Sequence, residues 1–163
     1  MNLNYDQVTG HISKDDGEVI ATGWAGNGEG KNNPALQAER NVGPLPQGLY
    51  QVGEWEYEHN GLGHDVVALL QVEGETFDRS GFFIHGPSVN LEHYGQESKG
   101  CIVVPRDGRL VVKSLNPDFV KVFASVVPEV APVETTVEQV ANVVSEGASI
   151  LSDVVDFIHP TEG

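Results

Sequence analysis

The sequence predicts a mainly β protein, a β-rich α+β fold with one or two short helices and a C-terminal amphipathic helix. Short β-prone runs, frequent turn residues and one long helical pattern near the end of the chain predict this class. The 163 residues include 19 glycines and nine prolines, which favours many turns. A chain of this length can bury roughly two thirds of its unfolded surface, so one folded core with an appendage is expected.

Seven short runs in residues 1–127 have the composition of strands and are separated by clusters of turn residues. They are residues 3–9, 18–24, 48–55, 66–72, 81–85, 101–104 and 119–126. Between the last two runs, residues 107–115 place Leu110, Val111 and Leu115 at roughly helical spacing. This spacing predicts one short helix, with a strand as the alternative.

Two long segments have loop composition. Residues 25–43 read AGNGEGKNNPALQAERNVG, and their glycines, together with Asn32, Asn33 and Pro34, disfavour both helix and strand. The second segment, residues 86–100, separates a histidine from the only cysteine of the chain. Loops this long in a small domain are often functional.

The composition changes at Pro128 to a linker rich in proline, valine and glutamate, and residues 135–158 then have a helical pattern. Thr135 with Glu138 has the form of a capping box. We therefore predict a domain over residues 1–127 and, over residues 128–163, a linker and an amphipathic helix. Its apolar stripe would pack against the β-rich domain, against a second copy of the chain, or against a delivery or virion protein.

The charge balance excludes several classes of partner. Nine Lys and Arg against 24 Asp and Glu give a formal charge of −15, which opposes binding to nucleic acid and to anionic membranes. The N-terminus lacks a basic patch followed by an apolar run, and no run approaches about 18 apolar residues. These patterns predict neither a signal peptide nor a membrane span.

The sequence FFIHG reads as a buried strand that ends at His85, and SKGC places Cys101 sixteen residues later, after a glycine turn. A thiol with a pKa of about 8.5 needs a nearby base to act as a nucleophile at neutral pH, and His85 is the candidate. The backbone N–H groups of Gly100 and Cys101 would form an oxyanion hole. These residues alone leave open whether Cys101 is instead a packed, inert core thiol, the usual state of a free cysteine.

IHG followed by SKGC resembles the L,D-transpeptidase signature, in which a His–Gly pair precedes Ser/Thr–His–Gly–Cys. With GNGEGKNNP at 26–34 and GPLPQGLYQVG at 43–53, the chain resembles the L,D-transpeptidase-like peptidoglycan effectors of type VI secretion, a group also found in phages. The resemblance covers most of residues 3–127. Lys99 and Val103 depart from the signature, so the substrate contacts of those two family positions do not transfer.

The resemblance implies a compact β-sandwich or barrel and a catalytic role for residues 1–127. Cys101 would attack the carbonyl that joins diaminopimelate to the terminal D-alanine of a tetrapeptide stem. Water would then give L,D-carboxypeptidase action and a free D-amino acid would give exchange, both favoured over cross-linking. No cofactor or metal is implied. The enzyme would be made in the cytoplasm and act in the periplasm, as a toxin or as a phage lysis enzyme after the host membrane is permeabilised.

The candidate site residues follow from the motif and from the carboxylates of the stem peptide. The bases near the motif are Arg79, Lys99 and Arg106, and Arg79 is the preferred carboxylate ligand, with a surface salt bridge as its alternative. Ser98 would position the cysteine turn, although it could be an ordinary turn serine. The predicted catalytic set is Cys101, His85, Gly100 and Ser98, and the predicted substrate-binding set is Arg79, Asn32, Asn33, Gly86, Lys99 and Arg106.

Two other readings remain. One is a non-catalytic structural or binding module of a phage particle that keeps the fold. The other is a zinc peptidase that uses His59, His64 and His85, but HNGLGHD lacks the helical spacing that places two imidazoles on one metal. Expected partners are peptidoglycan tetrapeptide stems and, for a toxin, an immunity protein.

Overall fold

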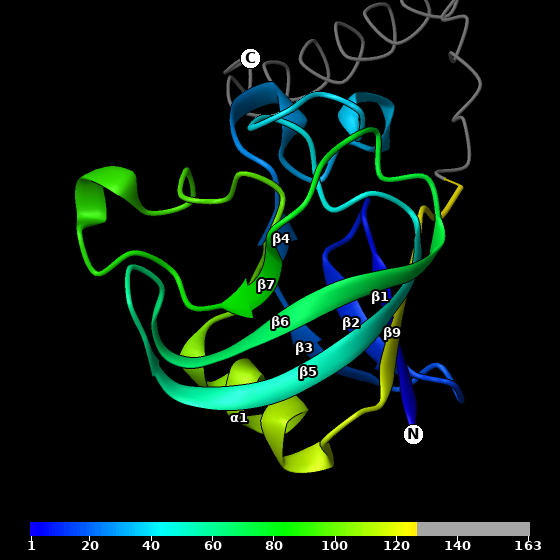
Figure 1. Cartoon of the computed structure of the whole chain (residues 1–163), viewed down its shortest axis with the longest axis vertical. Coiled ribbons are helices and arrows are strands. Elements are labelled where there is room, and N and C mark those ends of the chain that lie inside the picture. The colour runs from blue at the N-terminus through cyan, green and yellow to red at the C-terminus, as the bar shows by residue number, and fades with distance from the viewer. Residues whose placement is uncertain (127–163) are drawn as a thin grey trace, which may run out of the picture. The chain divides into compact units, whose positions relative to one another are not determined.

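Nine strands form one mixed sheet in the computed structural model, which describes residues 1–126 (Figure 1). The predicted linker and C-terminal helix lie outside the described residues, and the boundary near residue 128 stays a prediction. The strands are β1 (Asn2–Asp6), β2 (His11–Lys14), β3 (Val19–Thr22), β4 (Trp24–Ala25), β5 (Gly48–His59), β6 (Gly63–Gly74), β7 (Phe82–His85), β8 (Ile102–Val103) and β9 (Phe119–Phe123).

The strand order is β3-β2-β1-β9-β5-β6-β7-β8-β4. The pairs β1–β9 and β7–β8 are parallel, and the other neighbours are antiparallel. Strands β5 and β6 form a long hairpin that curves across the molecule (Figure 1). The β-rich fold class with one α-helix is therefore confirmed for the described residues.

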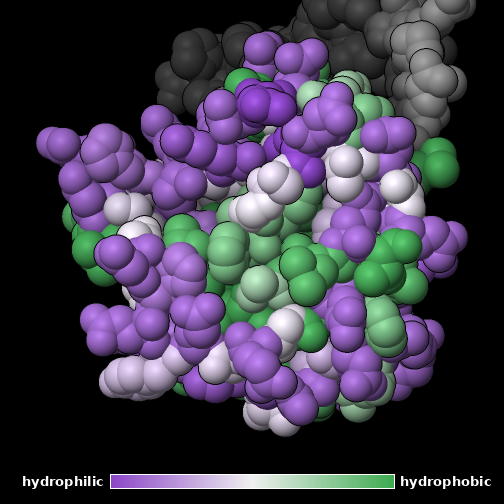
Figure 2. Space-filling model, in the orientation of Figure 1, coloured by the Kyte–Doolittle hydropathy of each residue, from purple (hydrophilic) through white to green (hydrophobic). Residues whose placement is uncertain are grey.

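The sheet folds over a single core. Ile12 on β2 and Ile102 on β8 stand near opposite ends of the strand order, yet both belong to the same buried cluster. Leu3, Val67 and Ile84 from intervening strands join them there. The open sheet thus gives the sandwich-like enclosure that was expected. Figure 2 shows further apolar side chains gathered near the middle of the viewed face, between polar margins.

All seven predicted runs contain a strand, and two strands were missed. Strand β2 was missed because its sequence, HISK, has one buried apolar side chain, Ile12. Strand β4 is two residues long and pairs with β8 at the sheet edge. The hairpin strands β5 and β6 extend to twelve residues each, beyond the predicted bounds, because their outer halves pair with each other.

Helix α1 (Arg106–Leu115) confirms the predicted short helix and excludes the strand alternative. Pro105 precedes its first turn, where a missing N–H has no cost, and Asn116 ends it in the left-handed region at φ 45°. The long loop between β4 and β5 contains the 3-10 turns η1 (Gly28–Gly30) and η2 (Pro34–Leu36), and the loop after β7 contains η3 (Leu91–His93). In residues 1–126, no helix is long and apolar enough to cross a membrane.

Candidate active site

The parallel pairing of β7 with β8 places the predicted nucleophile and base on one face of the sheet. Ile84 lies opposite Ile102, and both side chains point into the core. Because side chains alternate along a strand, His85 points to the other face, and the same alternation continued by one residue beyond β8 would turn Cys101 toward that face. Cys101 stands one position before this isoleucine pair and His85 one position after it, so the two are diagonal neighbours across adjacent strands.

His85 is held in a defined orientation. Its ring is 4% exposed, and Nδ1 lies 2.8 Å from the Gly86 carbonyl oxygen. A carbonyl can only accept, so Nδ1 carries the hydrogen and the neutral ring keeps its lone pair on Nε2. Burial lowers the pKa of His85, although the Gly86 carbonyl and the Glu97 charge oppose this shift. The ring is therefore a neutral base near neutral pH.

The Cys101 thiol is partly exposed, and its hydrogen-bond acceptor in the described structure is the Gly81 carbonyl, at 3.8 Å. Burial raises the pKa of the Cys101 thiol, while the backbone N–H of Phe83 and the charge of Arg79 lower it by less. No hydrogen bond joins the thiol to His85 among the described residues. The resting pair is thus a neutral thiol and a neutral imidazole rather than an ion pair, and such contacts often tighten only when substrate binds.

Gly100 is required by its surroundings. Its φ is +127°, and a Cβ there would lie 2.4 Å from Nη2 of Arg79. Its N–H donates to Oγ of Ser98 at 3.2 Å, which corrects the expectation that this N–H is one of two oxyanion donors. The Cys101 N–H remains the candidate donor. The glycine serves the site by allowing the close approach of Arg79, which a side chain would block.

Ser98 ties the nucleophile turn to the first long loop. Its side chain is 0% exposed, accepts from the Gly26 N–H at 2.9 Å, and donates to the Cys101 carbonyl at 2.6 Å. Asn27 reinforces this junction because its Nδ2 donates to the carbonyls of Ser98, at 2.7 Å, and Asn41, at 2.6 Å. Ser98 has the contacts of a positioning residue. Asn27 was missed, since nothing distinguishes it from the other asparagines of a loop.

Arg79 differs most from its expected role. It is 5% exposed, and its two terminal nitrogens donate to four backbone carbonyls, those of Gln37, Gly43, Pro44 and Lys99. These bonds use both hydrogens on each terminal nitrogen. The guanidinium therefore has no free pair of N–H groups with which to bind a substrate carboxylate. The preferred assignment of Arg79 as a carboxylate ligand is therefore corrected: it joins the first long loop to the turn before Cys101.

We expect Arg79→Leu to lower the free energy of unfolding by roughly 2–4 kcal/mol, because buried carbonyls lose a charged donor. Arg40→Leu is the matched control. Arg40 is exposed and makes one hydrogen bond to backbone, so its loss should change stability by about 0.5 kcal/mol or less. Denaturant unfolding of both variants measures the difference. Equal, small losses would show that Arg79 does not hold these loops together.

Three other residues that were predicted to bind substrate have different contacts or positions in the structure. Asn32 accepts from the Ala25 N–H at 3.1 Å, and Asn33 caps η2. Both amides are thus used inside the loop. Arg106 begins α1, beyond the far end of β8 from Cys101. The hydrogen bond and charge of Lys113 are the main causes of the lowered pKa of Asp65, and the Arg106 charge adds to them. The sequence shows these polar groups but not the local backbone groups that bind them.

Two hollows lie near the predicted catalytic residues, one at each end of β7. The first, of about 220 Å³, lies at the start of β7 and includes the predicted residues Arg79 and Lys99. The second, of about 290 Å³, lies at the end of β7 beside the β5–β6 hairpin turn (Figure 1). It is lined by Gly61, Leu62, Gly63, His85, Gly86, Pro87, Ser88, Val89 and Glu97.

Two residues near His85 were missed by the sequence analysis. Glu97 lines the second hollow, where one carboxylate oxygen accepts from the Ser88 N–H at 2.7 Å and the other is buried without a partner in the described residues. Arg109 donates to the Val104 carbonyl at 2.6 Å, and its guanidinium packs against Gly86 so closely that a Cβ there would lie 2.5 Å from Nη1. Gly86 therefore has a packing reason to be glycine.

The histidines of the zinc alternative do not converge. His59 packs against Phe83 with ring centroids 5.1 Å apart, and Nδ1 of His64 lies 3.2 Å from the Tyr57 carbonyl oxygen. Within residues 1–126, no group of three His, Cys, Asp or Glu side chains could hold a metal ion. The described geometry thus gives a zinc mechanism no ligand set.

A β-rich fold that presents a histidine and a Gly–Cys turn on adjacent parallel strands places the chain in the L,D-transpeptidase-like class. The chain belongs to the Tlde1 domain family, which matches residues 20–124. This family comprises type VI effectors, and the chain is accordingly a peptidoglycan-modifying enzyme.

Two solved structures of one L,D-transpeptidase are also similar to the chain. The catalytic domain from E. faecium L,D-transpeptidase, solved by NMR, is 22% identical, with 75% of this chain and 95% of that chain covered and a TM-score of 0.39. The same domain acylated by ertapenem is 20% identical at the same coverage, with a TM-score of 0.42. No curated protein matches the chain.

Proposed function

We propose that the chain is a cysteine L,D-carboxypeptidase that also exchanges D-amino acids on peptidoglycan tetrapeptide stems. The observation that carries this proposal is the parallel pairing of β7 with β8, whose register makes the backbone positions of Cys101 and His85 diagonal neighbours. A general base also needs a nitrogen that can accept the thiol proton. The hydrogen bond from His85 Nδ1 to the Gly86 carbonyl meets this need, because it leaves the lone pair on Nε2.

The first half of the reaction forms an acyl-enzyme. The thiol proton of Cys101 passes to Nε2 of His85 as Sγ attacks the carbonyl between diaminopimelate and D-alanine. The Cys101 N–H would stabilise the oxyanion. The C–N bond then breaks, His85 returns the proton to the departing amine, and D-alanine leaves a thioester on Cys101.

The second half of the reaction decides the product. Water, deprotonated by His85, attacks the thioester and releases a tripeptide carboxylate and the free thiol. The amine of a free D-amino acid can attack in place of water and gives a stem with a new fourth residue. The proposed setting is the periplasm, reached after synthesis in the cytoplasm and delivery by a secretion system or entry during phage lysis.

Purified tetrapeptide muropeptides test this proposal directly. We expect mass spectrometry to show tripeptide muropeptide and D-alanine in equal amounts, and a D-methionine-terminated stem when D-methionine is added. Cross-linked dimers as the main product would contradict the preference for hydrolysis and exchange. Stems that are bound but unchanged would favour the alternative function, a non-catalytic module of a phage particle.

A further inference from the structure

The hollow at the start of β7 is unusually cationic for this protein. It is lined by Arg40, Asn41, Asp78, Arg79, Ser80, Phe82 and Lys99. Three of the nine Lys and Arg residues of a chain with a charge of −15 therefore line one space of about 220 Å³. Such a concentration of positive charge favours an anionic ligand.

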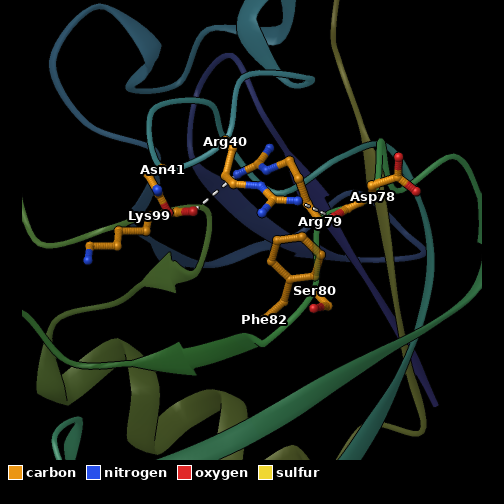
Figure 3. Close-up of a pocket in the computed structure, with 7 residues that line it drawn as sticks. All are labelled: Arg40, Asn41, Asp78, Arg79, Ser80, Phe82 and Lys99. Carbon is orange, nitrogen blue, oxygen red and sulfur yellow. Dashed lines mark hydrogen bonds between the residues drawn. The ribbon is translucent and has the colours of Figure 1, made fainter.

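Two guanidinium groups line this hollow, and the described residues provide neither with a carboxylate partner. Figure 3 shows the Arg40 and Arg79 side chains crossing at close range, and the Arg40 charge contributes to a lowered pKa of Arg79, whose main cause is burial. Neither arginine forms a salt bridge with a carboxylate in residues 1–126. The Asp78 carboxylate is turned to the side away from Lys99 (Figure 3). An anion bound here would relieve the repulsion between the two cations.

The two arginines differ in their freedom to bind. Arg79 is buried and uses its terminal nitrogens on four backbone carbonyls, so it contributes charge rather than new hydrogen bonds. Arg40 is exposed and makes one hydrogen bond in the described structure, from Nη2 to the Asp78 carbonyl at 2.9 Å. Its remaining N–H groups are available to a carboxylate. Lys99 also lines the hollow, and its side chain points away from the two arginines in Figure 3.

The hollow adjoins the nucleophile through two glycines. Gly81 stands between the lining residues Ser80 and Phe82, and its carbonyl oxygen lies 3.8 Å from Sγ of Cys101. Gly100 stands between Lys99 and Cys101. The hollow is therefore bordered by the chain neighbours of Cys101 and of its contact Gly81, which favours a carboxylate from a part of the substrate close to the attacked carbonyl.

Resting on the proposed function, we propose that this hollow is a carboxylate subsite in which Arg40 binds the C-terminal carboxylate of the stem peptide's D-alanine. This carboxylate is one residue from the attacked carbonyl, which the position of the hollow favours. The diaminopimelate side-chain carboxylate is the other source of the same chemistry, but the whole length of that side chain separates it from the attacked carbonyl. The subsite would select stems that end immediately after the scissile bond.

Binding to the inactive Cys101→Ala protein tests the subsite without any turnover. The probes are the synthetic tetrapeptide stem, its C-terminal amide, and the stem with an amidated diaminopimelate carboxylate, each measured by calorimetry. We expect the C-terminal amide to bind about tenfold more weakly, because one charge-assisted hydrogen-bonding pair is lost. The diaminopimelate amide should bind like the parent stem. Loss of binding with that amide alone would overturn the assignment to the D-alanine carboxylate.

Adding Arg40→Gln to the inactive protein should weaken binding of the parent stem about tenfold and leave binding of the C-terminal amide unchanged. Lys121→Gln, the same loss of charge at an exposed position on β9, is the matched control and should leave both unchanged. Equal weakening of acid and amide by Arg40→Gln, or no weakening of either, would overturn the proposal.

The active enzyme separates this inference from the proposed function. With an intact Cys101, Arg40→Gln should raise KM for the tetrapeptide about tenfold with little change in kcat. If Arg40→Gln converted stems with unchanged KM and kcat, the subsite proposal would be contradicted and the proposed reaction would be kept. If no D-alanine were released but binding of the acid still required Arg40, the reaction would fail while the subsite stood.

Discussion

Cys101→Ala will abolish release of D-alanine from tetrapeptide stems, with a loss of at least about 10³-fold, because the acyl-enzyme cannot form without the thiol. The fold should persist. Cys101 is partly exposed at the mouth of β8, and removing one sulfur there should lower the free energy of unfolding by roughly 1 kcal/mol or less. Product analysis and a thermal melt on the same protein sample measure both effects.

Cys101→Ser is the matched variant because it replaces the thiol with a hydroxyl of similar size at the same place. It should also lose nearly all turnover, since a neutral imidazole that suffices for a thiol is a weak base for an alcohol. Turnover by Cys101→Ala at more than a trace level would exclude Cys101 as the nucleophile.

His85→Ala will slow turnover by about 10²–10⁴-fold, the usual contribution of a positioned acid–base group. The reason lies in the two pKa shifts. Burial raises the pKa of Cys101, so little thiolate exists near neutral pH unless a base removes the proton. Burial lowers the pKa of His85, so its basic form persists to a lower pH than that of a free histidine. Wild-type activity should therefore fall only as the pH drops through this lowered pKa.

The rate of Cys101 alkylation by iodoacetamide, measured from about pH 5 to about pH 10, isolates this effect from substrate binding. Near neutral pH wild type should react faster than His85→Ala, because the imidazole can accept the thiol proton as the sulfur attacks, and the two rates should converge as the pH approaches the raised pKa of the thiol. His59→Gln is the control. It also removes an imidazole, but this ring packs on Phe83 of β7 and is not the proposed base. Identical alkylation profiles for wild type and His85→Ala would exclude His85 as the base.

The sequence was informative about strands because their apolar periodicity is local. It also singled out the proposed catalytic pair, since FFIHG and SKGC each combine a buried strand with a glycine. The two strands pair in parallel in the structure. It failed for β2 and β4, whose strand character comes from their neighbours: β4 is two residues long and is held by β8. Pairing with a distant strand leaves no periodic signal in so short a segment.

The surroundings of the site were less predictable because they depend on backbone groups brought together by loops. Arg79 was expected to bind substrate because its charge is visible in the sequence, but the four carbonyls that hold it come from residues 20 to 42 positions away. Arg40 lay in a segment that reads only as a loop. Glu97 and Arg109 reach His85 by tertiary folding alone, and their spacing in the sequence carries no signal.

The position of β9 bears on how the molecule can be assembled. This strand, from residues 119–123, pairs with β1 on one side and β5 on the other, so it alone joins the N-terminal strands to the rest of the sheet. During translation, β1–β3 therefore have no β9 to pair with until almost the whole domain has been synthesised. Pairings between such distant segments form slowly, because the chain must lose the entropy of closing a long loop before the strand contacts stabilise the fold. The sheet is consequently completed only after translation has passed Cys101, and a ribosome-bound fragment ending at α1 would lack the strand that joins β1–β3 to the rest of the sheet.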